Sequence, residues 1–340
     1  MSRDTALISP GQTVRLGVLG AARIAPKALI APARGLGGVE VHAVAARELS
    51  RARAFAAAYR IPKAMGSYAE LLADPAIDAV YIALPNSLHC EWTIAALQAG
   101  KHVLCEKPFA SNQNEARLMA AVAHAHGMIV AEAFHYCYHP LADRVAELLA
   151  AGVIGLPCNF EASFSVPIPP PNIRYELSLA GGATMDLGCY ALHMIRYFAG
   201  AEPRVVDASV TLFAPGLDIA MRARFEFANG AAARMDCSME ADARPGARLL
   251  VRGEDGALEV INPVAPHIGN VLTVTTRAGE RRETVAGETS YAYQLRAFVQ
   301  ALRGAKSLRI DGAEAVINMG LIDEVYRAAG LAPRGTLESH

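Results

Sequence analysis

The sequence predicts a two-domain α/β protein in which a doubly wound parallel sheet is followed by an α+β domain with a large, mostly antiparallel open sheet. Short apolar segments alternate with helical patterns in the first part of the chain, as is typical of a parallel sheet covered on both faces. Further along, apolar and polar residues alternate over longer segments separated by turns. The 340 residues also exceed the usual size of a single core. We therefore expect one domain at residues 1–135 and a second at 136–340.

The expected first domain contains closely spaced strands and helices. Strands are expected at residues 14–19, 39–45, 79–84, 102–105 and 128–131, with a short segment at 64–65, and helices at 24–33, 50–59, 68–72, 91–99 and 113–126. Ligands of such sheets bind beyond the carboxyl ends of the strands. A binding site is therefore expected at that edge.

The expected second domain is rich in strands that have one polar face. They are expected at residues 158–164, 205–213, 219–227, 231–239, 247–253, 256–261 and 271–276, and turn sequences such as Asn229-Gly230 and Asp255-Gly256 separate them. Helices at residues 290–303 and 312–329 close the chain.

Composition favours a small-molecule or protein partner over nucleic acid. The 32 Lys and Arg residues nearly balance the 33 Asp and Glu residues, and no basic run indicates nucleic-acid binding. The amino-terminal segment lacks the pattern of a secretory signal, and no apolar stretch is long enough to cross a membrane. The six scattered cysteines form no C-x-x-C pair. We therefore expect a cytoplasmic protein with reduced thiols.

The first strand is followed by a glycine turn that resembles a dinucleotide-binding fingerprint. The residues Gly20-Ala21-Ala22-Arg23-Ile24-Ala25 end a strand and open a helix, so backbone N–H groups and the helix dipole can hold a pyrophosphate. Alanine replaces the second and third glycines of the pattern. This context favours a Rossmann domain over a plain βα turn, with Gly20, Ala22, Arg23 and Ile24 at the cofactor.

Arg47 follows the second strand, where an acidic residue would bind the adenosine ribose of NAD. A guanidinium there suits a 2′-phosphate instead. The sequence therefore favours NADP, with NAD as the alternative, although Arg47 is also compatible with a solvated residue leading into a helix.

Residues 181–193 predict a helix with titratable side chains along one stripe. At about 100° per residue, Asp186, Tyr190 and His193 lie close together, whereas Leu187, Ala191 and Met194 lie on another face. General acid–base catalysis needs such groups within reach of one substrate. We expect one face to pack and the other to line a polar site.

Two other segments lie near the expected site. Glu132, His135 and His139 have a spacing that invites a metal-site reading, but Pro140 limits a continuous helix there, so we expect no metal. The proline-rich residues 166–175 are expected to form a stiff loop, from which Arg174 or Tyr175 reaches the pocket.

Three motifs, in this order, resemble the glucose–fructose oxidoreductase and inositol dehydrogenase family, also called Gfo/Idh/MocA. They are the opening βα turn, the segment 83–89 followed by Glu106-Lys107-Pro108, and the helix with the pattern Gly-Gly-x-x-x-Asp-x-Gly-x-Tyr. Within the family the chain is most similar to the dimeric dihydrodiol dehydrogenases, in which tyrosine occupies the position of Tyr190. That resemblance also implies a homodimer or homotetramer formed through the second-domain sheet.

The resemblance implies a role for each matched residue. Lys107 contacts the nicotinamide ribose and the substrate hydroxyl, and Tyr190 exchanges the hydroxyl proton during hydride transfer. Asp186 orients the substrate or offsets the charge of Lys107, and His193 is either a substrate hydrogen-bonder or a satisfied helix histidine. Further cofactor contacts fall on Leu84, Pro85, Asn86, His89 and Glu106.

These observations predict an NADP(H)-dependent oxidoreductase that acts on a secondary alcohol or ketone of a sugar, cyclitol or dihydrodiol. One alternative is an oxidoreductase that holds NAD(H) tightly and recycles it between two substrates. The other is a non-catalytic dinucleotide sensor on the same fold. Retention of both Lys107 and Tyr190 favours an enzyme, because sensing requires no proton transfer.

Overall fold

The computed structural model describes residues 7–335, and they divide into two compact units. The first comprises residues 7–135 together with Tyr291–Ile317, and the second comprises Tyr136–Ser290 together with residues 318–335. The sequence-based division assigned everything after residue 135 to the second domain. Residues 291–317 instead pack with the first unit, because they contribute apolar side chains to its core.

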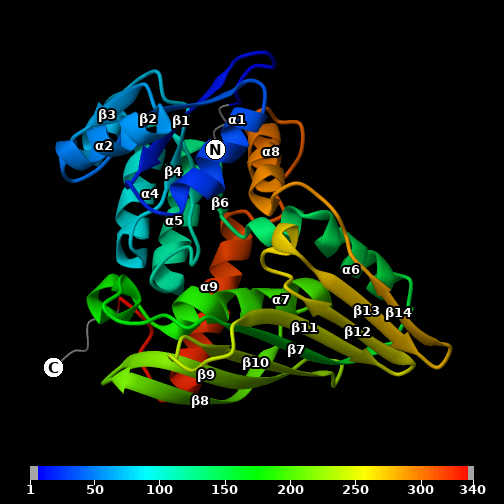
Figure 1. Cartoon of the computed structure of the whole chain (residues 1–340). Coiled ribbons are helices and arrows are strands. Elements are labelled where there is room, and N and C mark those ends of the chain that lie inside the picture. The colour runs from blue at the N-terminus through cyan, green and yellow to red at the C-terminus, as the bar shows by residue number, and fades with distance from the viewer. Residues whose placement is uncertain (1–6, 336–340) are drawn as a thin grey trace. The chain divides into compact units, whose positions relative to one another are not determined.

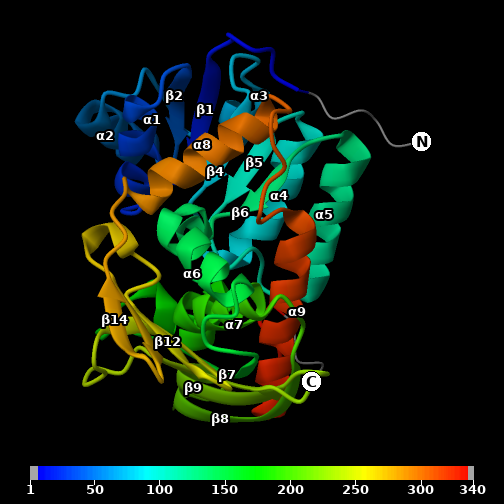
Figure 2. The same ribbon diagram turned by 90° about the vertical axis from the view of Figure 1, so that its right-hand side faces the viewer.

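The first unit is built on a parallel sheet of six strands in the order β3-β2-β1-β4-β5-β6 (Figure 1). The sheet comprises β1 (Val14–Leu19), β2 (Val39–Ala45), β3 (Lys63–Met65), β4 (Ala79–Ile82), β5 (His102–Cys105) and β6 (Val130–Glu132). Its helices are α1 (Ala31–Gly35), which continues a π-helical turn at Pro26–Ile30, α2 (Leu49–Tyr59), α3 (Tyr68–Ala73), α4 (His89–Gln98) and α5 (Gln113–His126). Helices α4 and α5 lie side by side (Figures 1 and 2). This is the doubly wound sheet that the alternation predicts.

Helix α8 (Ser290–Leu302) completes the core of the first unit. Its residues Leu295, Phe298 and Leu302 are buried in the same apolar cluster as Leu16 and Val18 of β1. Burying one large apolar side chain contributes about 1.5–3 kcal/mol. This packing explains why a segment so late in the chain belongs to the first unit.

The second unit contains a sheet of eight strands in the order β14-β13-β12-β11-β7-β10-β9-β8. The strands are β7 (Pro157–Ser165), β8 (Arg204–Ala214), β9 (Leu217–Glu226), β10 (Ala232–Ser238), β11 (Gly246–Gly253), β12 (Gly256–Ile261), β13 (Val271–Thr276) and β14 (Gly279–Glu283). All neighbours are antiparallel except β7 and β10, which are parallel. The expected fold class is therefore confirmed.

Three helices accompany this sheet: α6 (Pro140–Ala150), α7 (Cys189–Ala199) and the later part of α9 (Gly312–Ala328). Helix α7 packs on β7 and β10 (Figure 1). The sequence analysis missed α6 because it took Pro140 as a break. Proline is tolerated in the first turn of a helix, and the His139 side chain accepts a hydrogen bond from the N–H of Leu141 to cap α6.

Within residues 7–335, no helix is both long and apolar enough to cross a membrane.

Candidate functional site

The predicted cofactor residues of the first unit follow the carboxyl ends of its strands. Gly20 comes directly after β1 with φ +101°, a conformation that favours glycine. A Cβ at this position would lie 2.7 Å from the carbonyl oxygen of Ala83, so the chain after β1 passes too close to the chain after β4 for a side chain. Beyond Gly20, residues Ala22, Arg23 and Ile24 lead into the helical segment that starts at Pro26. The turn therefore keeps the glycine that its geometry requires, despite the alanines.

Two arginines gather near the end of β2. Arg47 and Arg51 both lie close enough to Tyr68 to counteract part of the rise that burial causes in the pKa of the tyrosine. Arg51, in the first turn of α2, also donates a hydrogen bond to the carbonyl of Ala21 at 3.3 Å. A 2′-phosphate needs several cationic or hydroxyl donors, and these side chains fit that group. The sequence analysis missed Arg51, although its spacing of four residues from Arg47 was a usable signal.

His89 is buried, and both of its ring nitrogens contact backbone carbonyl groups. Its Nδ1 lies 2.9 Å from the carbonyl oxygen of Pro108, and its Nε2 lies 3.0 Å from that of Leu84. Burial lowers the pKa of this imidazole. The ring therefore joins the segment that follows β4, which contains Pro85 and Asn86, to the segment that follows β5.

Neighbouring elements also hold the Glu106-Lys107-Pro108 segment. The hydroxyl of Tyr81 donates to Glu106 Oε1 at 2.5 Å, and Glu132 Oε1 accepts a hydrogen bond from the N–H of Phe109 at 2.9 Å. The Lys107–Pro108 peptide bond is cis. The N–H of Glu106 also donates to the carbonyl of Ile82 at 3.0 Å, so the chain on both sides of Lys107 is tied to β4 and β6 within the same sheet.

The predicted acid–base helix of the second unit begins with a π-helical turn at Thr184–Gly188 and continues as α7. Asp186 lies in that turn, and its carboxylate is 2.6 Å from Nε of Arg174. Burial opposes ionisation of Arg174, but the nearby Asp186 carboxylate and Tyr190 raise the pKa of the guanidinium overall. Arg174 thus lies beside both predicted site residues, as the loop hypothesis for residues 166–175 allowed.

Tyr190 lies one turn further along and is 5% exposed. Its ring stands edge-on to Phe164 of β7, with the ring centres 5.6 Å apart. The ring is also 6.2 Å from that of Tyr136. Aromatic packing against the sheet therefore restricts the orientation of the phenol.

His193 is fully buried, which corrects the expectation of a polar face along the whole stripe. Its Nδ1 lies 2.6 Å from the hydroxyl oxygen of Tyr136, and its ring stacks on Tyr197. Burial lowers the pKa of His193 well below its usual value, so the imidazole is neutral. Of its two roles left open above, this environment favours that of a buried helix histidine held through Nδ1. Tyr136 was missed because no local pattern marks it.

In the structure, Glu132, His135 and His139 each make a contact unrelated to metal binding. Glu132 holds the backbone of Phe109, the His135 ring packs against Tyr291, and His139 caps α6. Among residues 7–335, no group of three or more His, Cys, Asp or Glu side chains is arranged to hold a metal ion.

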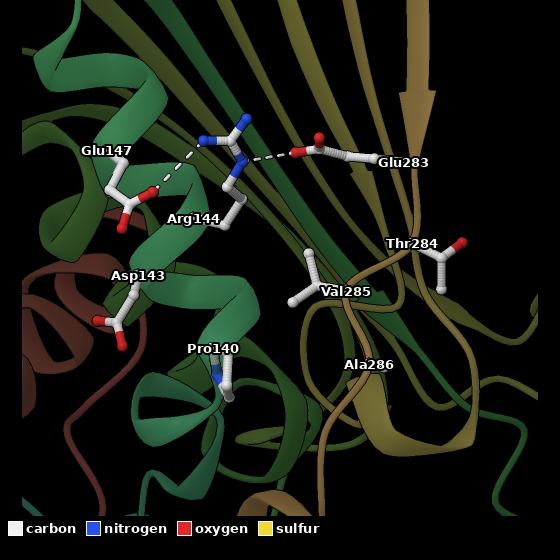
Figure 3. Close-up of a pocket in the computed structure, with 8 residues that line it drawn as sticks. All are labelled: Pro140, Asp143, Arg144, Glu147, Glu283, Thr284, Val285 and Ala286. Carbon is white, nitrogen blue, oxygen red and sulfur yellow. Dashed lines mark hydrogen bonds and ion pairs between the residues drawn. The ribbon is translucent and has the colours of Figure 1, made fainter.

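A shallow pocket in the second unit lies apart from these residues (Figure 3). It is lined by Pro140, Asp143, Arg144 and Glu147 of α6 and by Glu283, Thr284, Val285 and Ala286. Arg144 crosses it, with its Nε 2.8 Å from Glu283 and its Nη1 3.4 Å from Glu147. None of the predicted site residues lines this pocket.

A parallel sheet with a glycine turn after its first strand, in one chain with an open antiparallel sheet, is typical of the class of two-domain dinucleotide-binding proteins. Family comparison agrees with this class. Residues 14–134 match the model of the oxidoreductase family with an NAD-binding Rossmann fold, and residues 142–259 match the GFO/IDH/MocA C-terminal domain. The chain belongs to the Gfo/Idh/MocA family and is an NAD(P)-dependent oxidoreductase.

Individual relatives cover between about half and almost all of the chain. D-xylose 1-dehydrogenase (NADP(+)) 2 of Haloferax volcanii is 39% identical over 319 residues, which is 92% of this chain and 96% of the relative. A trans-1,2-dihydrobenzene-1,2-diol dehydrogenase of Xenopus laevis is 38% identical over 53% of this chain and 54% of its own. Among solved structures, KijD10, a 3-ketoreductase from Actinomadura kijaniata in complex with NADP and TDP-benzene, has a TM-score of 0.87 at 30% identity and covers 93% of this chain and 98% of its own.

Proposed function

We propose that the protein transfers hydride between NADP(H) and a secondary alcohol, or the matching ketone, of a sugar, cyclitol or dihydrodiol. The observation that carries this proposal is that one chain contains both a fixed Lys107 segment at the edge of the dinucleotide-binding sheet in the first unit and a buried tyrosine on an acid-bearing helix in the second unit. The D-xylose and dihydrodiol dehydrogenases to which the chain is similar act on polyhydroxylated compounds by name, which supports the same substrate class here.

In this proposal Tyr190 is the proton-transfer group and Lys107 its cationic partner. A phenol with an unperturbed pKa of about 10 is a poor base at neutral pH, and a nearby ammonium favours the phenolate. The phenol oxygen takes the proton of the substrate hydroxyl in oxidation and returns it in reduction. The bound nicotinamide accepts or supplies the hydride.

Asp186 and Arg174 form a second charged pair beside the phenol. Because Arg174 Nε is 2.6 Å from the Asp186 carboxylate, the pair holds both side chains in defined positions. We assign Asp186 to orienting substrate hydroxyls. His193 supports the helix from within, through its hydrogen bond to Tyr136.

The preference for NADP is assigned to Arg47 together with Arg51. Two guanidinium groups near one tyrosine hydroxyl suit a phosphate better than the two hydroxyls of an NAD ribose. The backbone around Gly20, Ala22, Arg23 and Ile24 is assigned to the pyrophosphate, at the start of the first helical segment.

The test is a substrate screen with absorbance detection of the reduced cofactor. Pentoses, hexoses, inositols and a dihydrodiol are offered with NADP and with NAD, and turnover with at least one polyol or sugar is expected. Tyr190→Phe should lower kcat about 10²–10⁴-fold and leave the Kd of NADPH unchanged. Tyr197→Phe, on the same helix, is the matched control and should keep wild-type turnover.

Other results would redirect the assignment. Near-normal turnover of Tyr190→Phe would remove the phenol from the mechanism. A nicotinamide that co-purifies and alternates its redox state with two added substrates would indicate recycling of held NAD(H). Binding of cofactor without hydride transfer to any compound would indicate a sensor.

We also propose a cytoplasmic homodimer or homotetramer formed through the sheet of the second unit. Surface-exposed strands of that sheet carry arginine–carboxylate pairs, such as Arg222 with Asp236 at 2.9 Å and Arg224 with Asp207. Charged groups on such an exposed face can fix the register of a second copy when opposite charges meet across the interface. Light scattering after size-exclusion chromatography measures the state, and a monomer at micromolar concentration would contradict it.

A further inference from the structure

A buried carboxylate stands at the start of the helix that carries Asp186 and Tyr190. Asp218, near the beginning of β9, is fully buried. Its Oδ2 accepts hydrogen bonds from the backbone N–H and the hydroxyl of Thr184, both at 2.7 Å. The first residue of the helical turn is therefore held by a side chain from a strand 34 residues further along the chain. A carboxylate there also offsets the partial positive charge of the helix start.

Arg334 neutralises that carboxylate and ties three segments together. Its guanidinium is 3% exposed, and its Nη2 donates to Asp218 Oδ1, which also accepts from the Tyr326 hydroxyl at 3.0 Å. Nε donates to the carbonyl of Gly181 and Nη1 to that of Gly216, each at 2.8 Å. The guanidinium lies over the Tyr326 ring, 4.2 Å from its centre. Each of the three guanidinium nitrogens thus donates a hydrogen bond.

The glycine turn lies between this pair and the Arg174 loop. A Cβ on Gly182 would be 2.1 Å from Asp218 Oδ1, and a Cβ on Gly181 would be 2.4 Å from the carbonyl oxygen of Arg174. The N–H of Gly182 donates to that same carbonyl at 2.9 Å. Arg174 in turn pairs with Asp186. A continuous set of contacts therefore runs from Arg334 through the Gly181–Gly182 turn to Arg174 and Asp186, which lie beside Tyr190.

We infer that Asp218 and Arg334 are positioning residues that fix the Gly181–Gly182 turn, and with it the places of Asp186, Tyr190 and Arg174. The inference rests on the proposed function of that helix. A buried ion pair is seldom a net gain in stability over apolar packing, but it specifies one geometry. Catalysis needs such definition, because a displacement of about 1 Å can cost about 10²-fold in rate.

Steady-state kinetics with a matched control tests the inference. Asp218→Asn and Arg334→Lys should lower kcat about 10–100-fold, with the KM for NADPH and its Kd within about twofold of wild type. The control is Arg196→Lys, which alters another buried guanidinium at the far end of the same helix, paired with Glu202. It should lower Tm without a comparable loss of kcat. Equal kcat losses at equal losses of Tm would overturn the inference.

A milder pair of variants covers the case in which these proteins fail to fold. Thr184→Val removes the hydroxyl that bonds Asp218, and Thr184→Ser keeps it. We expect Thr184→Val to lower kcat about tenfold and Thr184→Ser to restore it. Equal kcat in both variants would overturn the inference.

Amide hydrogen exchange separates this inference from the proposed function. The N–H groups of Thr184 and Asp186 bond to Asp218 and to the carbonyl of Gly182, so Thr184→Val should speed their exchange. Amides of α4 in the first unit serve as the internal reference. If wild-type protein turns over no substrate, the proposed function fails while this measurement still decides the positioning role. Unchanged exchange at both amides would refute that role.

Discussion

Replacing Gly182 by alanine tests how tightly the turn before the helix that carries Asp186 and Tyr190 is constrained. The residue has φ +127°, which a side chain rarely adopts, and the strain costs about 1–3 kcal/mol. The new Cβ would also lie 2.1 Å from Asp218 Oδ1 and 2.9 Å from Nη2 of Arg334. Displacing the carboxylate leaves two buried donors of Thr184 unsatisfied, at about 1–3 kcal/mol each. We expect a loss of about 3–9 kcal/mol in the free energy of unfolding.

Gly200, at the other end of the same helix, provides the control. It has φ +62°, and a Cβ there meets nothing within 4 Å. Gly200→Ala therefore adds only the left-handed penalty of about 1–2 kcal/mol. Urea unfolding followed by far-UV circular dichroism measures both variants, and kcat is determined for each. A Gly182→Ala loss no larger than that of Gly200→Ala would refute the steric reasoning.

Three further predictions concern the cofactor, the charged pair and pH. Arg51→Gln should weaken NADP(H) binding about 10–150-fold and leave NAD(H) binding unchanged. Arg53→Gln, at an exposed position on the same helix, is the control. Equal effects of Arg51→Gln on both cofactors would contradict a phosphate contact. Arg174→Met should lower kcat at least about tenfold, because Asp186 loses its cationic partner. Arg174→Lys should recover part of the lost kcat. A kcat–pH profile that is the same in wild type and in Arg174→Met would contradict a role for this ion pair. Burial lowers the folded-state pKa of His89 and His193. Their contribution to the free energy of unfolding is therefore complete above the unfolded-state pKa of about 6.5, and it declines as the pH falls below that value, by up to about 1.4 kcal/mol per pH unit for each histidine. Urea midpoints that stay level between about pH 7.5 and 5.5 would count against the neutral, buried imidazoles.

The local pattern of the chain was enough to predict most of the elements. Apolar strands followed by amphipathic helices predicted the parallel sheet, and period-two segments predicted most of the second sheet. The sequence analysis did not predict strand β14, because its residues Gly279–Glu283 are mostly exposed and charged and show no apolar face. Hydrophobic periodicity arises from a buried face, and an exposed edge strand buries too little of its surface to show such a pattern.

Some candidate site residues could also be predicted from local sequence patterns. Gly20 after an apolar strand and Arg47 after the next are marked by their positions in the βα pattern. The acid and phenol at positions 186 and 190 are marked by helical spacing. By contrast, the burial of His193 against Tyr136 joins residues 57 positions apart, and no periodicity encodes it.

The sequence by itself determined the alternation of elements, the two kinds of sheet and the residue types available at the candidate site, because these depend on short-range periodicity and backbone sterics. Tertiary structure alone decided which distant groups meet. It brought α8 into the core of the first unit and set Arg334 against the carbonyl of Gly181, 153 positions earlier in the chain. Such contacts arise when buried polar groups must find partners wherever the folded backbone presents them, and that requirement leaves no local pattern in the sequence.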